Sequence, residues 1–427
     1  MTDPILTEAP PAASRGGQGP GAGLRPMQLF RDIAVVPTRL LDPGGIPRGG
    51  PLWPDYDHQT VVRHCRNGRP VDRRPDDPER PDEILAGATV WGGMARRHFG
   101  HLVAEFTTRL AQSVAERPED RFLFILDPGA TAAEVPAHVW ALLEWHGLDR
   151  RQVVFVERPV GVERLHVAAQ GEQVNTVGPS GAYLDLLEAN ARRRRLEPER
   201  SDILYVGRAG LCRLGQGGHA GEAHLVSVLR SLGVRILDPA AADLRTQLAC
   251  YLGAKTIVFA EGSAIHGRQL LGRLDQRVVI LVRRPGHHMA PAQLKPRCRE
   301  VHYAEATRTL LAPIRRDGPN RALGIAFYDV SVLMRVFADL GLDLARQWEG
   351  KAYQAAIEED VTDWLRIRFV KPGGYLPGPS RKACREILAK EGLGHLDVDN
   401  RIPKVALPSG VGATARQALK RLMRWPG

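Results

Sequence analysis

The segment from His98 to Arg109 carries residues whose types and spacing are suited to acid–base chemistry. Residues three and four positions apart share one face of a helix. One polar stripe would therefore comprise His98, His101, Glu105 and Arg109. An imidazole beside a carboxylate can act as a general base, and a guanidinium on the same element can bind an anion. The same pattern also fits a solvated helix face with an incidental arrangement of charges.

A second candidate site follows the apolar run 256–259, where a buried strand would pass through a glycine into a helix. The first amides of such a helix have no partners within it, and they favour phosphate or another anion. Gly262 would let a ligand approach the backbone, and Ser263 would cap the helix or bind the ligand. Glu261 could accept hydrogen bonds from ribose or sugar hydroxyls, and His266 could donate one to phosphate. Many strand-to-helix turns contain glycine and serine for structural reasons alone.

Arg208 belongs to a third candidate site, at the end of the apolar run 203–206 and inside a glycine-rich loop. A guanidinium in this position can bind two oxygens of a diphosphate at once. A solvated loop arginine would have the same sequence surroundings. The loop lacks the Gly-Lys-Ser/Thr of a nucleotide-hydrolysing P-loop, and its glycines do not match the dinucleotide-binding pattern.

Short apolar runs alternate with amphipathic segments over most of the chain, which is typical of an α/β protein with a parallel sheet. Strands are predicted at 122–126, 153–156, 203–206, 234–237, 256–259 and 278–282, with a further one near 165–168. Helices are predicted at 135–146, 183–195, 222–232, 244–252 and 264–274. Ligands bind at the carboxyl ends of the strands in such sheets, which is where the second and third candidate sites fall.

The chain has 427 residues, more than one hydrophobic core usually serves. We predict a disordered leader at 1–27, a first α/β domain at 28–196 and a second, Rossmann-like domain at 197–325. A helical extension at 326–427 would follow. The arginine run at 192–195 and Pro198 mark the connection between the domains. Amphipathic helices at 328–340 and 352–366 are expected to pack back on the core, against the first domain.

The formal net charge of +11 fits a nucleic acid, an anionic membrane surface or a phosphate-bearing substrate. No zinc-finger spacing, RNA-binding aromatic motif or helix-turn-helix pattern supports a nucleic-acid partner. The five cysteines are scattered without a CxxC pair, which predicts neither zinc nor disulfides and fits a reducing cytoplasm. No apolar run is long enough for a signal peptide or a membrane span. The basic amphipathic segment 413–425 could rest on an anionic membrane or dock as a surface helix.

In this order, the three sites resemble the glycosyltransferase family 61 domain, in the form found in bacterial capsular polysaccharide biosynthesis proteins. The resemblance covers about residues 88–283. It rests on an HFGH motif with Glu105 and Arg109-Leu110, on Tyr205-Val206 with Arg208, on Glu222, on Pro239 with Gln247-Leu248-Ala249, and on the run from Glu261 to His266. Gly207 replaces a serine that the family often has, and Ala240 replaces an expected glutamate.

The resemblance implies a GT-B-type enzyme, in which two Rossmann-like domains face a cleft and the second holds a nucleotide-sugar donor. It also implies a transfer that inverts the anomeric carbon and needs no metal or other cofactor. The chain has no Asp-x-Asp motif in a plausible setting, and positive groups with a helix N-terminus could stabilise the leaving diphosphate instead. The acceptor would be a glycan or lipid-linked glycan of surface or capsular polysaccharide synthesis. The protein would then work in the bacterial cytoplasm or peripherally at the inner membrane.

An inverting transfer needs one base that deprotonates the acceptor hydroxyl. We assign this role to His101, with Glu105 orienting or charging it, and His98 is the second candidate. Arg208, Gly262, Ser263 and His266 would hold the diphosphate, Glu261 would hold the ribose or the donor sugar, and Arg109 and Glu222 complete the predicted donor-binding set.

Two other functions stay open on the sequence. Gly207 and Ala240 prompt the first, a noncatalytic relative that binds a sugar nucleotide or glycan within a polysaccharide assembly complex. The second is a nucleotide-dependent α/β enzyme of another class, such as an epimerase or a dehydrogenase. The missing dinucleotide-binding pattern counts against the second.

Overall fold

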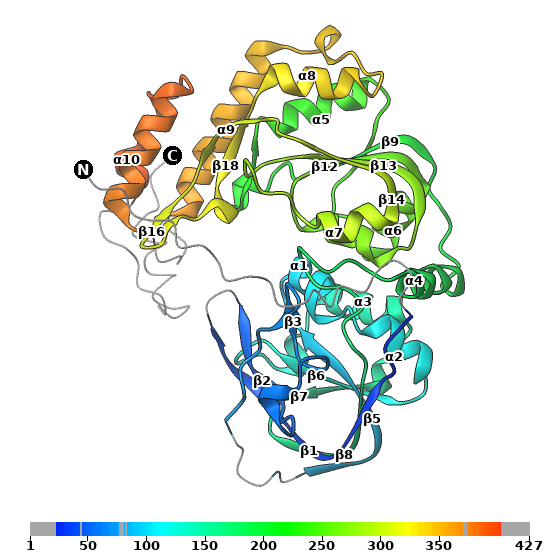
Figure 1. The fold of residues 1–427 in the computed structure, drawn as a ribbon. Coiled ribbons are helices and arrows are strands. Elements are labelled where there is room, and N and C mark those ends of the chain that lie inside the picture. Colours follow the sequence, from blue (N-terminus) through cyan, green and yellow to red (C-terminus); the bar gives the residue numbers. More distant parts are fainter. Residues whose placement is uncertain (1–22, 43–44, 77–80, 82, 370–374, 403–427) are drawn as a thin grey trace, which may run out of the picture.

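The computed structural model describes residues 23–402 apart from 43–44, 77–80, 82 and 370–374. The chain forms an α/β structure of two halves, each built around a sheet that contains parallel strands (Figure 1). Most of the predicted leader and the whole segment 413–425 lie outside the described residues. Residues 23–27 do not fit the predicted disordered leader, because Leu24 packs beside Tyr183 and the carbonyl of Arg25 accepts a hydrogen bond from Gln112.

A six-stranded mixed sheet with the order β2-β1-β8-β5-β6-β7 forms the first half. Its strands are β1 (Gln28–Asp42), β2 (Ile46–Pro51), β5 (Glu83–Ala95), β6 (Arg121–Leu126), β7 (Val153–Val156) and β8 (Val160–Val167). Strands β5, β6 and β7 run parallel, as predicted for 122–126 and 153–156. Strand β1 runs antiparallel to β2 and β8. Neither β1 nor β2 was predicted, because proline, glycine and arginine interrupt their apolar pattern.

A five-stranded parallel sheet with the order β11-β9-β12-β13-β14 forms the centre of the second half. Its strands are β9 (Ser201–Val206), β11 (Arg235–Leu237), β12 (Ala254–Ala260), β13 (Leu274–Leu281) and β14 (Cys298–Ala304). Successive residues of a strand point to opposite faces. Phe259 and Ile280 belong to the core on one face, and Val258 and Val279 to the core on the other. Helix α6 (Leu244–Gly253) covers the first face and α5 (Glu222–Ser231) the second, which confirms the predicted parallel α/β arrangement.

The helix predicted at 264–274 is wrong in type and length. A 3₁₀ helix, η6 (Ser263–Leu270), takes its place, and β13 begins at Leu274. Arg268 is fully buried and donates to the carbonyls of Leu271 and Gly272. These carbonyls are therefore bound by a side chain instead of by helical amides, and the helix ends there.

The C-terminal helices pack on the second half, and not on the first half as expected. They are α8 (Val330–Ala338), α9 (Gly350–Arg368), α10 (Pro377–Lys390) and α11 (Val398–Arg401). Trp364 of α9 shares a core with Val258 and Val279 of the parallel sheet. Figure 1 shows α8 and α9 near α5, at the end of the second half that lies farthest from the first. An amphipathic pattern identifies the buried face of a helix but not the surface that the face covers.

The path of the chain brings β18 (Ile325–Tyr328) back beside β10 (Gly218–Ala220), parallel to it, and β15 (Thr307–Leu311) completes a small three-stranded sheet. The long α9 therefore covers a surface made from segments that are far apart in the sequence. Within the described residues, no helix is both long enough and apolar enough to cross a membrane.

One continuous hydrophobic core joins the two halves. It contains Val139 and Leu142 of α3 (Ala137–His146) in the first half, and Leu248 and Tyr251 of α6 in the second. Helix α4 (Gly181–Arg193) lies between the halves in Figure 1 and packs on α2 (Leu110–Glu116). Burial of apolar surface therefore holds the two sheets in a fixed relation.

A buried ion pair also ties the connector that follows β8, residues 168–180, to the second half. Arg297 is 1% exposed and donates from both terminal nitrogens to the carboxylate of Glu172, over 2.8 and 2.9 Å. Burial raises the pKa of Glu172, although the guanidinium of Arg297 opposes that shift. Removing one partner of such a pair would leave an uncompensated buried charge.

Candidate functional site

The segment after His98 is not one regular helix. Helix α1 (Phe99–His101) passes into a π-helical turn, η2 (Leu102–Phe106), in which the amide of Thr107 donates to the carbonyl of Leu102 over 3.1 Å. A π turn adds one residue to the normal helical repeat and changes the direction of the side chains that follow. His98, His101 and Glu105 still lie together, but the predicted stripe ends at Glu105.

Arg109 lies beyond the π turn and points into the first half. It is 2% exposed and donates to the carbonyls of Val62 and Ala168, over 3.1 and 3.2 Å. The prediction that Arg109 binds the donor is therefore wrong, because its guanidinium is committed to backbone groups in the protein interior.

His101 and Glu105 form a hydrogen-bonded pair on the surface of the first half. The Nδ1–H of His101 donates to Oε1 of Glu105 over 2.5 Å. The side chain of Glu105 is 4% exposed, whereas that of His101 is 39% exposed. With its Nδ1 proton held by the carboxylate, a neutral His101 has its unprotonated Nε2 free to accept a proton.

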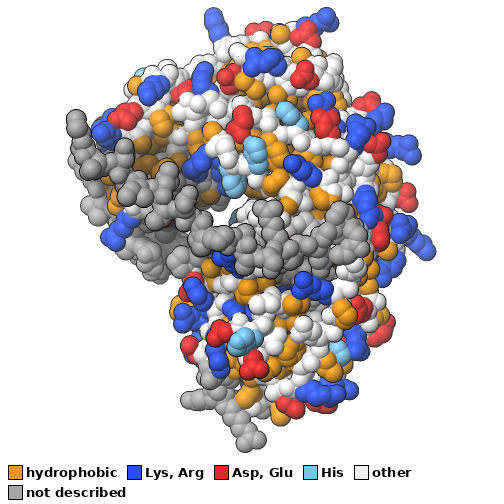
Figure 2. Space-filling view, in the orientation of Figure 1, with side chains coloured by type: hydrophobic (Ala, Val, Ile, Leu, Met, Phe, Trp, Pro, Cys, Tyr) orange, Lys and Arg blue, Asp and Glu red, His pale blue; other side chains and the backbone are white. Residues whose placement is uncertain are grey.

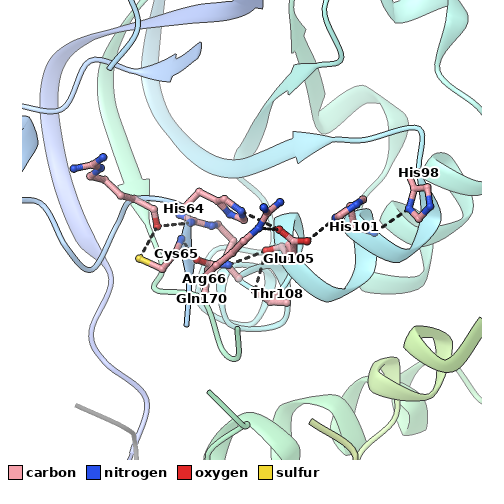
Figure 3. A network of polar contacts seen from close by, with 10 residues as sticks. His64, Cys65, Arg66, His98, His101, Glu105, Thr108 and Gln170 are labelled. Carbon is pink, nitrogen blue, oxygen red and sulfur yellow. Dashed lines mark hydrogen bonds and ion pairs between the residues drawn. The ribbon is translucent and has the colours of Figure 1, made fainter. Parts of the chain in front are cut away.

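Two further side chains hold the other oxygen of Glu105, as Figure 3 shows. Nε of Arg66 donates to Oε2 over 2.5 Å, and Nε2 of His64 lies 3.3 Å from it. Burial alone would raise the pKa of Glu105, but the hydrogen bonds from His101 and His64 and the charge of Arg66 hold it well below its usual range. Glu105 is therefore a carboxylate with cationic or polar groups on both oxygens.

No role was predicted for His64 or Arg66. Both lie in the loop-rich segment 42–82, about forty residues before Glu105. One local signal was present: Asn67 and Gly68 occupy the turn of the hairpin formed by β3 (Cys65–Arg66) and β4 (Arg69–Pro70), with φ angles of 52° and 76°. An Asn-Gly pair is the preferred turn of a two-residue hairpin, which requires this left-handed backbone.

His98 is the N-cap of α1, and its Nδ1 accepts a hydrogen bond from the amide of His101 over 3.4 Å. Partial burial and the neighbouring His101 lower the pKa of His98. A neutral His98 that accepts at Nδ1 carries its proton on Nε2. His98 is therefore arranged as a hydrogen-bond donor toward a ligand, and His101 is the better placed base.

Three sequence segments that were predicted as separate sites meet where α1 contacts η6. A Cβ atom on Gly100 would lie 3.1 Å from the His266 ring and 3.2 Å from Oγ of Ser263. A Cβ atom on Gly262 would lie 1.9 Å from a terminal nitrogen of Arg208. Glycine at position 100 thus permits close approach of the two halves, and glycine at position 262 permits close approach of two loops within the second half.

Arg208 lies at the carboxyl end of β9 and lines a cleft between the halves. One terminal nitrogen donates to the carbonyl of Gly217 over 2.8 Å. Its buried Nε has no hydrogen-bond partner among the described residues. Burial lowers the pKa of Arg208, and the nearby charge of Glu222 opposes that shift. A guanidinium in the cleft wall is suited to an anionic ligand.

Glu222 and Glu261 lie behind the cleft, which corrects their predicted contact with the donor. Both side chains are fully buried. Glu222 accepts from the hydroxyl of Tyr205 over 2.7 Å and from the amide of Arg208 over 2.8 Å. Glu261 accepts from the amide of Arg283 over 2.7 Å and pairs with the Arg284 side chain over 2.5 Å. Each carboxylate accepts hydrogen bonds from backbone amides of the loop that follows a strand. Glu222 and Glu261 therefore fix the conformation of these loops.

The pKa of Glu222 is raised to about 7, chiefly by burial, while the hydrogen bonds from Arg208 and Tyr205 oppose the shift. The folded protein therefore holds this proton more tightly than the unfolded chain, whose ordinary value is 4.5. The stability that this group contributes is complete below pH 4.5 and is lost as the pH rises toward 7.

We expect Glu222→Gln, which is neutral at every pH, to be more stable than the wild type by roughly 2 kcal/mol at pH 8, with little difference at pH 5. Urea unfolding at the two pH values measures this. Glu119→Gln, at an exposed glutamate, is the control and should change stability equally at both. Equal stability of Glu222→Gln and wild type at pH 8 would contradict the expectation.

His266 is 7% exposed, and its Nδ1–H donates to Oε1 of Gln269 over 2.9 Å. Burial lowers the pKa of His266 to about 4. The neutral ring then presents an unprotonated Nε2, which accepts hydrogen bonds and cannot donate them. In this tautomer His266 would accept a hydrogen bond from a ligand, and not donate one to phosphate as predicted.

The cleft has a volume of about 640 Å³. The second half contributes Arg208, Leu211, Ser263 and the loop from Asp238 to Asp243, and the first half contributes Phe99, His138 and two alanines, Ala137 and Ala141. Ala240 also lies in this wall. Neither His98 nor His101 lines this cleft, although Gly100, which lies between them in the sequence, contacts Ser263.

Basic side chains are spread over both halves on the face shown in Figure 2, without gathering into one patch. Among the described residues, no group of three or more His, Cys, Asp or Glu side chains is arranged to hold a metal ion. The cleft wall itself carries the polar side chains of Arg208, Asp238, Gln247 and Ser263, a set suited to an organic anion with hydroxyl groups.

No family model matches the chain, and a search of curated proteins finds no match. The solved structures that match include the flavodiiron protein from Giardia intestinalis, which is 14% identical with a TM-score of 0.18. That alignment covers 52% of this chain and 54% of the other, so it spans about half the length of each. A likeness this low carries no argument about fold or activity.

Proposed function

We propose that this protein is a glycosyltransferase that moves a sugar from a nucleotide-sugar donor to a hydroxyl group of a surface or capsular polysaccharide precursor. One observation carries the proposal: Arg208 and Ser263 line one cleft between two α/β halves, and the helix that carries His101 contacts Ser263 at Gly100. The arrangement would be of GT-B type, as in family 61, and transfer would invert the anomeric carbon without a metal. Sugar transfer would take place in the cytoplasm, and the segment 413–425 would contact the inner membrane.

His101 would act as the base. Its free Nε2 accepts the proton of the acceptor hydroxyl as that oxygen forms a bond to the anomeric carbon. The bond from this carbon to the diphosphate breaks on the opposite face, and the nucleoside diphosphate leaves with the electron pair. The imidazolium that forms is stabilised by the carboxylate of Glu105, 2.5 Å from Nδ1.

Arg208 and Ser263 would stabilise the leaving diphosphate. The guanidinium has a buried Nε without a partner in the described chain, and Ser263 lies in the same wall at the start of η6. Preorganised donors aimed at developing negative charge lower the barrier of such a transfer.

Asp238 would bind the ribose in place of Glu261, which is sealed behind the cleft. The carboxylates in the described cleft wall are Asp238 and Asp243. Asp243 caps α6 through the amide of Thr246, whereas Asp238 follows β11 and binds the amide of Ala240 over 2.9 Å. An acidic side chain at the end of the second strand of a nucleotide-binding sheet is well placed to accept ribose hydroxyls.

The second candidate function is a noncatalytic sugar-nucleotide or glycan-binding relative. Ala240 favours it, because an alanine lies in the cleft wall where the family has a glutamate. Any measured transfer of sugar would exclude this function.

The proposed function is tested by thermal shift with a panel of nucleotide sugars and nucleoside diphosphates, with and without EDTA. A ligand that binds the folded state raises the melting temperature by mass action. We expect a shift with one nucleotide family that EDTA does not change. No shift with any member of the panel would contradict a donor site in this cleft.

Arg208→Ala is expected to weaken binding of the nucleoside diphosphate found in that screen about 30-fold, or about 2 kcal/mol, because charge-assisted hydrogen bonds are lost. Isothermal titration calorimetry gives the Kd. Arg213→Ala is the matched control, since Arg213 is on the same loop but pairs with Glu359 at the surface. If Arg213→Ala weakens binding of the nucleoside diphosphate as much as Arg208→Ala does, the effect comes from net charge and not from a contact with Arg208.

A further inference from the structure

The β3–β4 hairpin, Cys65–Arg66 with Arg69–Pro70, lies outside the part of the chain that resembles family 61. It nevertheless delivers Arg66 to the carboxylate of Glu105, 2.5 Å from Oε2, on the side opposite His101 (Figure 3). His64, which precedes the hairpin, reaches the same oxygen and stacks on Phe106 with ring centroids 4.3 Å apart. Glu105, which orients the proposed base His101, is thus itself oriented by a separate segment of the chain.

The hairpin is held to the π turn by hydrogen bonds on its other side. The side-chain oxygen of Gln170 accepts from the amide of Cys65 over 2.6 Å, and its nitrogen donates to the carbonyl of Glu105 over 2.9 Å. At the hairpin turn, the amide of Gly68 donates to the side chain of Gln173 over 2.7 Å. The hairpin therefore contacts the side chain of Glu105 directly, through Arg66, and its backbone indirectly, through Gln170.

Gln170 and Gln173 belong to the connector 168–180, which the second half also holds. The side chain of Gln293 donates to the carbonyl of Val177 over 3.0 Å, and Arg297 pairs with Glu172. The connector therefore fixes the hairpin with respect to the half that carries the proposed donor site.

We propose that Arg66 is a positioning residue that locks the Glu105 carboxylate in the orientation that keeps His101 in its Nδ1–H form, with Nε2 toward the acceptor. The inference rests on the proposed role of His101 as the base. Arg66 acts through Glu105 and need not touch substrate. The Nε–H of Arg66 holds one carboxylate oxygen with a charge-assisted hydrogen bond, which leaves the other oxygen toward His101.

The first test reads the tautomer of His101 directly, without substrate. Nitrogen-15 NMR of the full chain, with the signal assigned by its loss in His101→Asn, distinguishes a protonated from an unprotonated ring nitrogen. We expect the wild type to be protonated at Nδ1, Arg66→Gln to become a mixture of the two tautomers, and Arg66→Lys to retain most of the Nδ1–H form. Arg69→Gln, at an exposed arginine of the same hairpin, should match the wild type.

The second test follows transfer once a donor is known. Arg66→Gln should lower kcat about tenfold to 100-fold with the KM for the donor unchanged, and Arg66→Lys should recover much of the loss. If Arg66→Gln does not fold, Gln173→Ala should still show partial loss of the Nδ1–H form, whereas Arg66→Lys should retain most of it. An unchanged tautomer in all Arg66 variants overturns the inference. If wild-type protein transfers no sugar but the tautomer shifts as expected, the proposed function fails while the positioning role of Arg66 on Glu105 stands.

Discussion

Replacing His101 with asparagine is expected to lower kcat by about three orders of magnitude while the Kd for the nucleoside diphosphate stays within about twofold of wild type. Asparagine can still donate to Glu105 but cannot accept the proton of the acceptor hydroxyl. The diphosphate would bind to Arg208 and Ser263, which the substitution leaves in place. Initial rates with saturating donor, together with calorimetric titration of the nucleoside diphosphate, measure both quantities.

Two other histidines serve as controls for this substitution. His138 lines the same cleft and bonds the carbonyl of Arg97 over 3.0 Å, so His138→Asn should leave kcat within a few-fold of wild type. His98→Asn should cost less than His101→Asn, because His98 accepts at Nδ1 and is not paired with a carboxylate. An unchanged rate in His101→Asn, or a greater loss in His98→Asn, would contradict the assignment of His101 as the base.

The second large effect concerns the buried ion pair. Glu172→Leu is expected to lower the free energy of unfolding by about 3–5 kcal/mol, because Arg297 would then be a buried charge without its counterion. Arg297 would keep its hydrogen bonds to backbone carbonyls, including that of Gln293 at 2.7 Å, but these do not neutralise it. The midpoint of urea unfolding, followed by tryptophan fluorescence, reports the change.

The double variant Glu172→Leu with Arg297→Met is the informative partner of that experiment. Removing both charges should restore most of the lost stability, since apolar side chains of similar volume often replace a buried pair at little cost. Asp185→Ala, which breaks the exposed pair with Arg273, should change stability by less than about 1 kcal/mol. A single variant as stable as the wild type would mean that Arg297 finds another counterion or reaches water.

The strands were predictable because their evidence is local. Alternate residues of β12 and β13 fill two different cores, and both faces of the sheet are apolar, so the sequence shows continuous hydrophobic runs. Turn chemistry at the strand ends also singled out Arg208 and Gly262, which the structure places against each other. Their direct contact could not be predicted, since it depends on which loops the strand order brings together.

The predictions that were wrong concern residues whose surroundings depend on contacts between segments far apart in the sequence. A π turn depends on packing around it, so helical spacing placed Arg109 on the wrong face. Glu222 and Glu261 have the residue type and place of ligand-binding groups, but backbone amides of neighbouring loops already occupy them. For His266, the side chain of Gln269 decides which ring nitrogen carries the proton. The packing of α9 on the second half could not be predicted either, because the apolar face of a helix can cover many different surfaces.

The core that runs through α3 and α6 has a consequence for how this chain reaches its native state. Neither half can bury its share of that core without the other, so each would expose a broad apolar surface if it were expressed alone. The two sheets therefore belong to one cooperative unit rather than to two modules that fold separately and dock later. The proposed site lies on the seam of this unit, so its geometry becomes complete only when the whole chain has folded.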